Sequence, residues 1–311
     1  FFFAQYSSPS GPPLRPRSCR ATVAMACAAS GTALERARAL APHVPAPRLL
    51  RGGEGEEADW WETHGPVLRA AWREWGPLRP NVRSLPDLCL TEEARQALGQ
   101  RTEKALRGAV AEVAPGVYSL PLVTAEGCHV LREELAHAEA SGIPQRRPNG
   151  MNRYGTILED VGLGGLAQAL VDRCLRPLAA VLFPEWDGAG LETNYGFAVR
   201  YRVGEDVELA EHTDAANVTL NVCLGTSFEG GDLYFRGLRQ NPGQEPRHVV
   251  PHRPGYALIH AGARWHAALP ITSGERCNII VWGMGPDGAV LIRPMAQLAA
   301  SEGNAIDTAE G

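Results

Sequence analysis

The spacing of apolar residues changes along the chain, from a helical period in the first two thirds to a strand period in the last third. Helical spacing occurs in a segment that begins at Pro66 and in segments 91–113, 124–141 and 165–182. Pro66 suits the first turn of a helix, where its missing amide has no partner to lose, and Thr124 is a suitable N-cap. The pattern predicts that this part of the chain is mostly helical.

After residue 191, short runs rich in Val, Ile, Thr and Tyr alternate with turns of Gly, Pro and Asp. The runs are 195–201, 218–224, 231–235, 249–250, 256–259 and 277–282. Short strands at this spacing are typical of a sandwich or barrel. Helices followed by strands predict an α+β fold, in which a double-stranded β-helix (jelly roll) is buttressed by helices and preceded by a helical N-terminal extension.

These changes in residue pattern divide the chain into four segments. Residues 1–58, rich in Pro, Gly, Ala and Arg, are expected to form a poorly ordered leader. A helical N-terminal region is expected over 59–115 and the main domain over 116–295, with its jelly-roll core at about 192–284. Residues 296–311 are expected to form a tail.

The first 34 residues contain no acidic side chain but include three arginines. That composition is typical of an organelle-targeting segment, although the Ala-rich stretch 21–29 also suits a signal peptide, and a leader before a start at Met25 is the third interpretation. No apolar run approaches the ~20 residues needed to span a membrane. We therefore expect a cytoplasmic protein, with organelle targeting as the alternative.

Composition narrows the classes of function. The formal net charge of -5 provides no global basic field for nucleic acid or for an anionic membrane. The seven cysteines are scattered, odd in number and form no C-x-x-C pair, which argues against a disulfide framework and a cysteine zinc site. Buried free thiols in a reducing compartment are expected instead.

A histidine and an aspartate are the first candidate metal ligands. His212 and Asp214 are two residues apart, so in an extended strand both point to the same side and can reach one metal ion. Two histidines and one carboxylate hold iron(II) in non-haem oxygenases and leave three positions open. The third ligand has to come from a later strand, and His266 is the better candidate. His260 competes, but no arginine follows it ten residues later, whereas Arg276 follows His266 at that distance.

The segment around His266 predicts a hairpin. The turn 270–274 separates His266 from Arg276, which begins the strand 277–282. A guanidinium at this position can clamp the distal carboxylate of a dicarboxylic co-substrate in a bidentate pair. The first arm would then hold a metal ligand and the second the co-substrate.

Strict alternation over 218–224 supports a polar pocket. Thr219, Asn221 and Cys223 share one face of this strand, and buried polar groups need hydrogen-bond partners. A bound dicarboxylate would supply them, whereas an edge strand with one face in solvent is the alternative. The last strand repeats the pattern, with Arg276 and Asn278 at the start of one face.

The stretch from Phe197 to Trp282 resembles the prolyl and lysyl hydroxylase branch of the 2-oxoglutarate dioxygenases, especially collagen lysyl hydroxylases. The matching residues are Val199-Arg200-Tyr201, Gly204, His212-Thr213-Asp214-Ala215, Thr219-Leu220-Asn221-Val222, Glu229-Gly230-Gly231, Phe235, Gly255 to His260, His266, Leu269-Pro270, Gly274 and Arg276. A narrower resemblance, to the subfamily of 2-oxoglutarate and iron-dependent oxygenase domain-containing protein 2, is carried by 147–155 (R-P-N-G-M-N-R-Y-G), Leu158 and Gly162-Leu163. Together these matches cover about residues 116 to 284.

The resemblance implies a cofactor set and an activity. It implies iron(II), 2-oxoglutarate and O2, with ascorbate as reductant, and hydroxylation of a C–H bond with release of succinate and CO2. The implied metal ligands are His212, Asp214 and His266. Arg276 is implied as the 2-oxoglutarate ligand, with Tyr201, Thr219 and Asn221 as further pocket contacts.

Two positions remain open within this resemblance. Many relatives have a tyrosine where Cys223 stands, so hydrogen bonding to the distal carboxylate is expected to differ here. The segment 147–155 either shapes the substrate entrance or forms a structural turn. A protein side chain is the substrate class that the resemblance suggests, and a small molecule is the alternative. The sequence does not indicate an oligomeric state.

Three other functions have less support in the sequence. Nucleic-acid demethylases use the same ligands, and Arg276-Cys277-Asn278 begins their closing motif, but Trp282 replaces its second arginine and no basic run is available for phosphates. A non-catalytic jelly-roll binding module would have lost a ligand or the arginine, and all four are present. Halogenation is disfavoured because Asp214 stands where a halide must bind.

Overall fold

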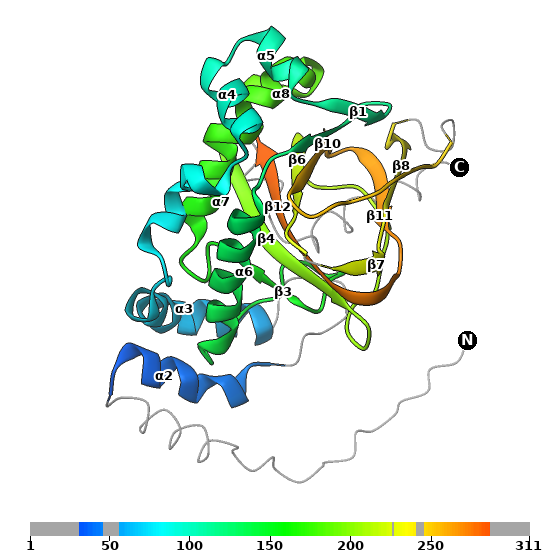
Figure 1. Ribbon diagram of the computed structural model, residues 1–311. Helices are drawn as coiled ribbons and strands as arrows, with labels where there is room; N and C mark the ends of the chain where they lie inside the picture. Colours follow the sequence, from blue (N-terminus) through cyan, green and yellow to red (C-terminus); the bar gives the residue numbers. More distant parts are fainter. Residues whose placement is uncertain (1–30, 46–55, 226, 241–245, 287–311) are drawn as a thin grey trace, which may run out of the picture.

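The computed structural model describes residues 31–45, 56–225, 227–240 and 246–286. Within these ranges, helices predominate before residue 191, and most strands of two antiparallel sheets come after it (Figure 1). The predicted mixture of helices with antiparallel sheet is confirmed. The α-helices are α2 (Ala33–Leu40), α3 (Glu56–Trp75), α4 (Glu92–Gln100), α5 (Glu103–Gly108), α6 (Ala125–Ala140), α7 (Gly164–Leu170) and α8 (Arg176–Leu182).

Twelve strands in the described residues form the two sheets. They are β1 (Ala111–Ala114), β2 (Val117–Pro121), β3 (Gly155–Ile157), β4 (Thr193–Arg202), β5 (Leu209–His212), β6 (Val218–Cys223), β7 (Phe228–Gly230), β8 (Leu233–Leu238), β9 (His248–Val250), β10 (Tyr256–Ala261), β11 (Arg264–Ala268) and β12 (Ile271–Met284). The larger sheet has the order β1-β2-β10-β6-β12-β4-β3, with β7 also paired to β12. The smaller sheet has the order β5-β11-β8-β9.

The alternation of residues in β6 and β12 places the core in two layers. Val218, Leu220 and Val222 of β6 face the helices and pack with residues of α6, α7 and α8. Residues on the other side of the larger sheet pack against the smaller sheet, as Phe197 of β4 and Phe235 of β8 do. Figure 1 shows the helices gathered on the outer side of β4 and β12, with β8 and β11 on the other side. The space between the sheets is therefore where polar residues of the inner faces meet.

Threonine N-caps mark several helix starts, because their hydroxyls accept backbone amides that have no partner within the helix. Thr124 accepts from the Gly127 amide at 2.9 Å, so the predicted helix over 124–141 is confirmed with its cap. Thr102 accepts from the Ala105 amide at 3.2 Å and divides the predicted helix 91–113 into α4 and α5, which strand β1 follows. The predicted helix 165–182 is present as α7 and α8, joined by a π-helical turn.

Two expectations near the N-terminus differ from the structure. Pro66 does not begin a helix, because α3 starts ten residues earlier, at Glu56, and contains Pro66. Trp60 and Trp61 pack against the core, and this packing favours a helix that begins upstream of Pro66. Pro66 has no amide hydrogen, so the helix loses one backbone hydrogen bond there. Helix α2 forms within the part expected to have little fixed structure, and the Leu34 amide donates to the Glu74 carboxylate of α3 at 3.1 Å.

The predicted hairpin after His266 is wrong. Strand β11 belongs to the smaller sheet and pairs with β5 and β8, whereas β12 belongs to the larger sheet and pairs with β4 and β6. The expected turn at 270–274 is instead mostly the first part of β12, which pairs there with β7. The chain therefore crosses between the sheets, which puts His266 and Arg276 on opposite walls of the space between them.

The structure tests only some of the remaining expectations on the organisation of the chain. The residues 1–30 of the proposed targeting segment and the tail 296–311 lie outside the described residues. The division at residues 58, 115 and 295 stays a prediction. Within the described ranges, no helix is both long and apolar enough to cross a bilayer. The cysteines of those ranges are free and buried, as expected: Cys89, Cys128, Cys174, Cys223 and Cys277.

Candidate metal centre

Three of the predicted site residues meet at one point between the sheets. His212 ends β5, Asp214 follows it in a turn, and His266 lies directly opposite His212 in the register of β5 and β11. The Nε2 atoms of His212 and His266 lie 3.6 and 3.7 Å from Asp214 Oδ1. In the part of the chain that the structure describes, this is the one group of three such side chains with ligand atoms all within 4.8 Å of one another. Two imidazoles and a carboxylate at this spacing fit iron(II).

Hydrogen bonds orient each of these side chains. His212 Nδ1 lies 2.8 Å from the Ala210 carbonyl and His266 Nδ1 lies 3.0 Å from the Arg264 carbonyl. Carbonyls accept only, so each Nδ1 carries the proton and each Nε2 lone pair is free to bind a metal.

Thr219 orients the carboxylate of this group. Its hydroxyl donates to Asp214 Oδ2 at 2.6 Å, which leaves Oδ1 facing the two histidines. The Thr219 side chain lines the same pocket, as predicted for a co-substrate contact, but its hydroxyl hydrogen is used by Asp214. Within this geometry Thr219 acts on the carboxylate.

The charges of the group suit metal binding. Burial, and next the neighbouring His266, lower the pKa of His212 to about 4. Burial opposes ionisation of Asp214, but the nearby histidines and the Thr219 hydrogen bond outweigh it and lower the pKa of that carboxyl. At neutral pH His212 is therefore neutral and Asp214 ionised, the forms that bind a metal ion.

His260, the competing candidate, lies beside this group without joining it. Leu258 and His260 of β10 do point inward, so the register that would allow His260 to compete is present. His260 Nε2 lies 4.0 Å from Asp214 Oδ2, the oxygen that Thr219 holds, and its Nδ1 lies 2.9 Å from the Ala261 carbonyl. His260 thus packs behind the carboxylate, whereas His266 faces the same carboxylate oxygen as His212.

We expect replacement of His266 and replacement of His260 to have different effects on metal binding and activity. His266→Ala removes a ligand and should eliminate both high-affinity metal binding and succinate formation. His260→Ala leaves the three ligand atoms in place and should keep measurable activity. Thermal unfolding of both variants controls for misfolding, and the reverse pattern of activity would show that His260 is the ligand.

Arg276 lies across the cavity from the metal group. Its side chain is 1% exposed, its Cζ lies 4.5 Å from the centre of the Tyr201 ring, and it donates to the Gly231 carbonyl. Gly231 has φ of 69°, and a Cβ there would lie 3.1 Å from Arg276 Nη1, so glycine permits this close approach. No carboxylate of the described residues forms an ion pair with Arg276, and its Nε has no partner among them. A buried guanidinium in this state fits the carboxylate of a ligand.

The pocket that joins these groups has a volume of about 70 Å3 and a mostly apolar wall. Tyr201, Thr219 and Asn221, the predicted contacts, all line it. Asn221 Oδ1 accepts from Asn278 Nδ2 at 2.7 Å, while Asn278 Oδ1 has no partner in the described residues. Cys223 is fully buried near Arg276, and burial raises its pKa to about 11, so it contributes a neutral thiol.

Three residues of this pocket come from one segment to which the sequence assigned no binding role. Asn149, Met151 and Asn152 line it from the segment between α6 and β3. The signal is the motif 147–155, which fits either a structural turn or an element of the substrate entrance. The structure places this motif at the wall of the metal pocket.

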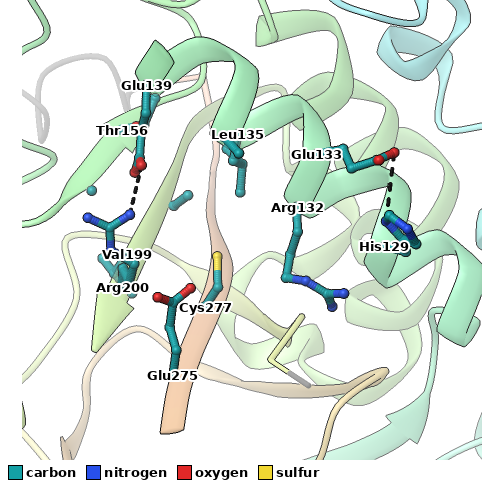
Figure 2. Close-up of a pocket in the computed structure, with 13 residues that line it drawn as sticks. His129, Arg132, Glu133, Leu135, Glu139, Thr156, Val199, Arg200, Glu275 and Cys277 are labelled. Atoms are coloured by element: carbon teal, nitrogen blue, oxygen red, sulfur yellow. Dashed lines mark hydrogen bonds and ion pairs between the residues drawn. The ribbon is translucent and has the colours of Figure 1, made fainter. Parts of the chain in front are cut away.

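A larger cavity lies on the other face of the same sheet and contains none of this chemistry. Figure 2 shows it between α6 and strands β4 and β12, with Arg200 and Cys277 on its wall; its volume is about 320 Å3. Four of its polar groups pair with one another: Arg200 Nη1 lies 2.7 Å from the Glu139 carboxylate, and His129 Nδ1 lies 3.7 Å from that of Glu133. The smaller pocket is therefore the candidate site.

A buried histidine near Arg276 gives the protein a pH dependence. Burial, and next the charge of Arg276, lower the pKa of His252 from 6.5 to about 3, so the fold favours its neutral form. As pH falls below 6.5, protonation in the unfolded chain favours unfolding, by about 2 kcal/mol at pH 5. The free energy of unfolding of metal-free protein should therefore fall between pH 7 and 5, and His252→Gln should reduce that fall by about 2 kcal/mol. Urea titrations at both pH values test this, and an equal fall in the variant would contradict it.

Comparisons with known proteins bear on this site. Residues 72–188 match the sequence model of the OGFOD2-like domain. The chain is 45% identical over 169 residues to human 2-oxoglutarate and iron-dependent oxygenase domain-containing protein 2, covering 53% of this chain and 48% of that protein. It is 37% identical over 196 residues to the Arabidopsis thaliana protein ICU11 of the same description, covering 60% and 49%. The resemblance indicated by the motif 147–155 is confirmed, and the chain spans about half the length of these relatives.

More distant similarities are also present. Rat multifunctional procollagen lysine hydroxylase and glycosyltransferase LH3 is 33% identical over 181 residues, which cover 54% of this chain and 23% of that protein. Among solved structures, a prolyl 4-hydroxylase of Phytophthora capsici aligns with 14% identity and a TM-score of 0.45, covering 63% of this chain and 67% of that one. The metal group described above rests on the geometry of this chain itself.

Proposed function

We propose that this chain is an iron(II)- and 2-oxoglutarate-dependent dioxygenase, with the metal on His212, Asp214 and His266 and the co-substrate on Arg276. The observation that carries the proposal is one cavity with two complementary walls. One wall holds two imidazoles and a carboxylate around a common point. The other holds a buried guanidinium that has no carboxylate partner in the described residues. The pairing of a metal centre with an anion site fits a dicarboxylic acid that binds at both ends.

The two antiparallel sheets with inward-facing site residues support a double-stranded β-helix as the catalytic core. The ligands come from the smaller sheet and its turn, and Arg276 comes from the larger sheet. His212, His266 and Arg276 are held by strand pairing, and the Asp214 amide donates to the Gly262 carbonyl at 2.8 Å. This backbone support suits a site that must position its reactants.

The residues of this chain bind, orient and exclude water, while bound iron with 2-oxoglutarate and O2 supplies the oxidising chemistry. Arg276 fixes the distal carboxylate, and Thr219 holds the Asp214 carboxylate. Apolar side chains of the wall, among them Phe197 and Trp282, keep the cavity dry. The overall reaction would convert 2-oxoglutarate and O2 to succinate and CO2 with hydroxylation of a C–H bond.

For the substrate we propose a protein side chain. The support is the similarity to the lysine hydroxylase named above, and a small molecule is the alternative. Ascorbate is proposed as the reductant, as the resemblance to prolyl and lysyl hydroxylases suggests. The free, buried cysteines of the described residues fit a reducing compartment, and we propose the cytoplasm.

Succinate formation tests the proposal. Purified protein is incubated with iron(II), 2-oxoglutarate, ascorbate and O2, first alone and then with peptide and metabolite panels. We expect succinate in amounts that depend on both iron and O2 and that rise when a substrate is present. A protein that binds neither iron(II) nor 2-oxoglutarate would be a jelly-roll binding module instead.

A further inference from the structure

The segment 147–155 is fixed at both ends beside the metal pocket. Tyr195 Oη donates to the Pro148 carbonyl at 2.5 Å. The Asp206 carboxylate accepts the backbone amides of Arg153 and Tyr154 at 2.6 and 3.2 Å. The loop between these anchors is thereby held against the cavity that it lines.

Backbone amides determine how Asn149 is oriented. Its Oδ1 accepts from the amides of Met151 and Asn152 at 2.9 and 2.8 Å. Backbone amides can only donate, so the oxygen of Asn149 must face them and its NH2 group must face away. That NH2 group donates to Asn152 Oδ1 at 3.1 Å.

The orientation of Asn149 in turn determines that of Asn152. Because Asn152 Oδ1 receives the Asn149 hydrogen bond, the NH2 group of Asn152 faces Tyr201 and donates to its Oη at 3.2 Å. Asn152 is 1% exposed, so water does not compete for these bonds. Two asparagines thus transmit a fixed direction of hydrogen bonding from the loop backbone to a tyrosine.

Tyr201 is left with one hydrogen to donate. Its side chain is buried, and burial raises its pKa, so the phenol is protonated at neutral pH. Its neighbours Asn152 and Arg276 both present donors to its oxygen. The Tyr201 hydroxyl donates to no acceptor among the described residues, although Tyr201 lines the pocket. A buried donor needs an acceptor, and a ligand carboxylate beside Arg276 would provide one.

We propose that Asn152, oriented by Asn149, is a positioning residue that sets the Tyr201 hydroxyl as a hydrogen-bond donor to a carboxylate of 2-oxoglutarate. This inference rests on the proposed function. It also gives the OGFOD2-like segment 72–188 a part in the site, since its loop reaches the pocket through Asn152 whereas the metal ligands lie beyond it.

Equilibrium binding of 2-oxoglutarate tests the proposal without turnover. Iron(II)-loaded protein is titrated with 2-oxoglutarate under nitrogen in a calorimeter. Tyr201→Phe removes the donor and should weaken binding about tenfold or more, as expected for a hydrogen bond to a charged group. Asn152→Ala removes only the orienting partner and should weaken binding by roughly threefold to tenfold. Asn152→Asp should weaken it at least as much as Tyr201→Phe, because its carboxylate would accept the hydrogen bond of the Tyr201 hydroxyl and repel the ligand.

A double-mutant cycle separates positioning from general damage. In the Tyr201→Phe background, Asn152→Ala should cause no further loss of affinity. Thr156→Val is the matched control: Thr156 is 2% exposed, and its hydroxyl donates to Gln145 at 2.9 Å beside the cavity on the other face of the sheet (Figure 2). Its loss should lower the thermal stability and leave 2-oxoglutarate affinity unchanged.

The outcomes distinguish this inference from the proposed function. If the wild-type protein binds 2-oxoglutarate and both Asn152 variants bind it equally well, the positioning role is overturned and the proposed function stands. If Asn152→Ala weakens binding equally in both backgrounds, Asn152 acts through general structure and the role is again overturned. If the wild-type iron-loaded protein does not bind 2-oxoglutarate, both fail together.

Discussion

Asp214→Ala should abolish high-affinity iron(II) binding and the iron-dependent formation of succinate. Asp214 supplies the only carboxylate of the metal group, and its removal leaves two imidazoles facing a buried space. We expect the affinity for iron(II) to fall by more than about a hundredfold, beyond the loss typical of residues that only support a ligand. His212→Ala should behave in the same way.

Two other variants make this first prediction sharper. Thr219→Val keeps all three ligands but loses the 2.6 Å hydrogen bond to Asp214, so its affinity for iron(II) should fall by only about tenfold. Asp172→Ala removes a carboxylate paired with Arg176 on the helical side and should bind iron(II) normally. Iron(II) affinity is measured by competition with a chelator under nitrogen. Full affinity in Asp214→Ala would contradict the ligand assignment.

The second large effect concerns Arg276. Replacing a buried arginine that clamps a carboxylate leaves the ligand charge unpaired in a dry pocket, at a cost of roughly 2–5 kcal/mol. Arg276→Gln should therefore raise the 2-oxoglutarate requirement at least about tenfold while iron(II) binding stays intact. Arg276→Lys should restore binding only partly, because an ammonium cannot form the planar two-point pair.

A neighbouring arginine provides the control for this variant. Arg200 lies on β4, opposite Cys277 of β12, and faces the cavity behind the sheet, where Glu139 and Glu205 pair with it. Arg200→Gln should leave the dependence of succinate formation on 2-oxoglutarate unchanged. If Arg276→Gln also leaves it unchanged, the co-substrate is not bound as proposed, even if the metal assignment survives.

Strand periodicity explains how much of the site could be predicted from sequence. The alternation in 218–224 predicted which residues of β6 face inward, and Thr219 and Asn221 do line the pocket. This prediction for β6 holds because backbone pairing forces neighbouring side chains to opposite faces of a sheet. His212 and Asp214 also meet, with 3.6 Å between Nε2 and Oδ1, but Asp214 lies beyond the end of β5, so a period of two does not explain its position.

Relations between distant segments could not be obtained in this way. The turn-like residues 270–274 suggested a hairpin, but local sequence does not say which sheet each arm joins, and β11 and β12 join different ones. Arg276, ten residues after His266, favoured His266 over His260 as the ligand, but the sequence did not show that both side chains point inward. Their distances to the two Asp214 oxygens separate them in the structure. The approach of Asn152 to Tyr201 depends on anchors at Tyr195 and Asp206, which sequence spacing does not reveal.

The most direct test of the central claim is the visible absorption of the iron(II) protein under nitrogen as 2-oxoglutarate is added. Chelation of 2-oxoglutarate by iron(II) in this site should produce a weak charge-transfer band that saturates with one equivalent bound. The band should be absent in Asp214→Ala, and in Arg276→Gln it should require at least about tenfold more 2-oxoglutarate. No band in the wild-type protein at saturating iron(II) and 2-oxoglutarate, or the same band in Asp214→Ala, would contradict the account.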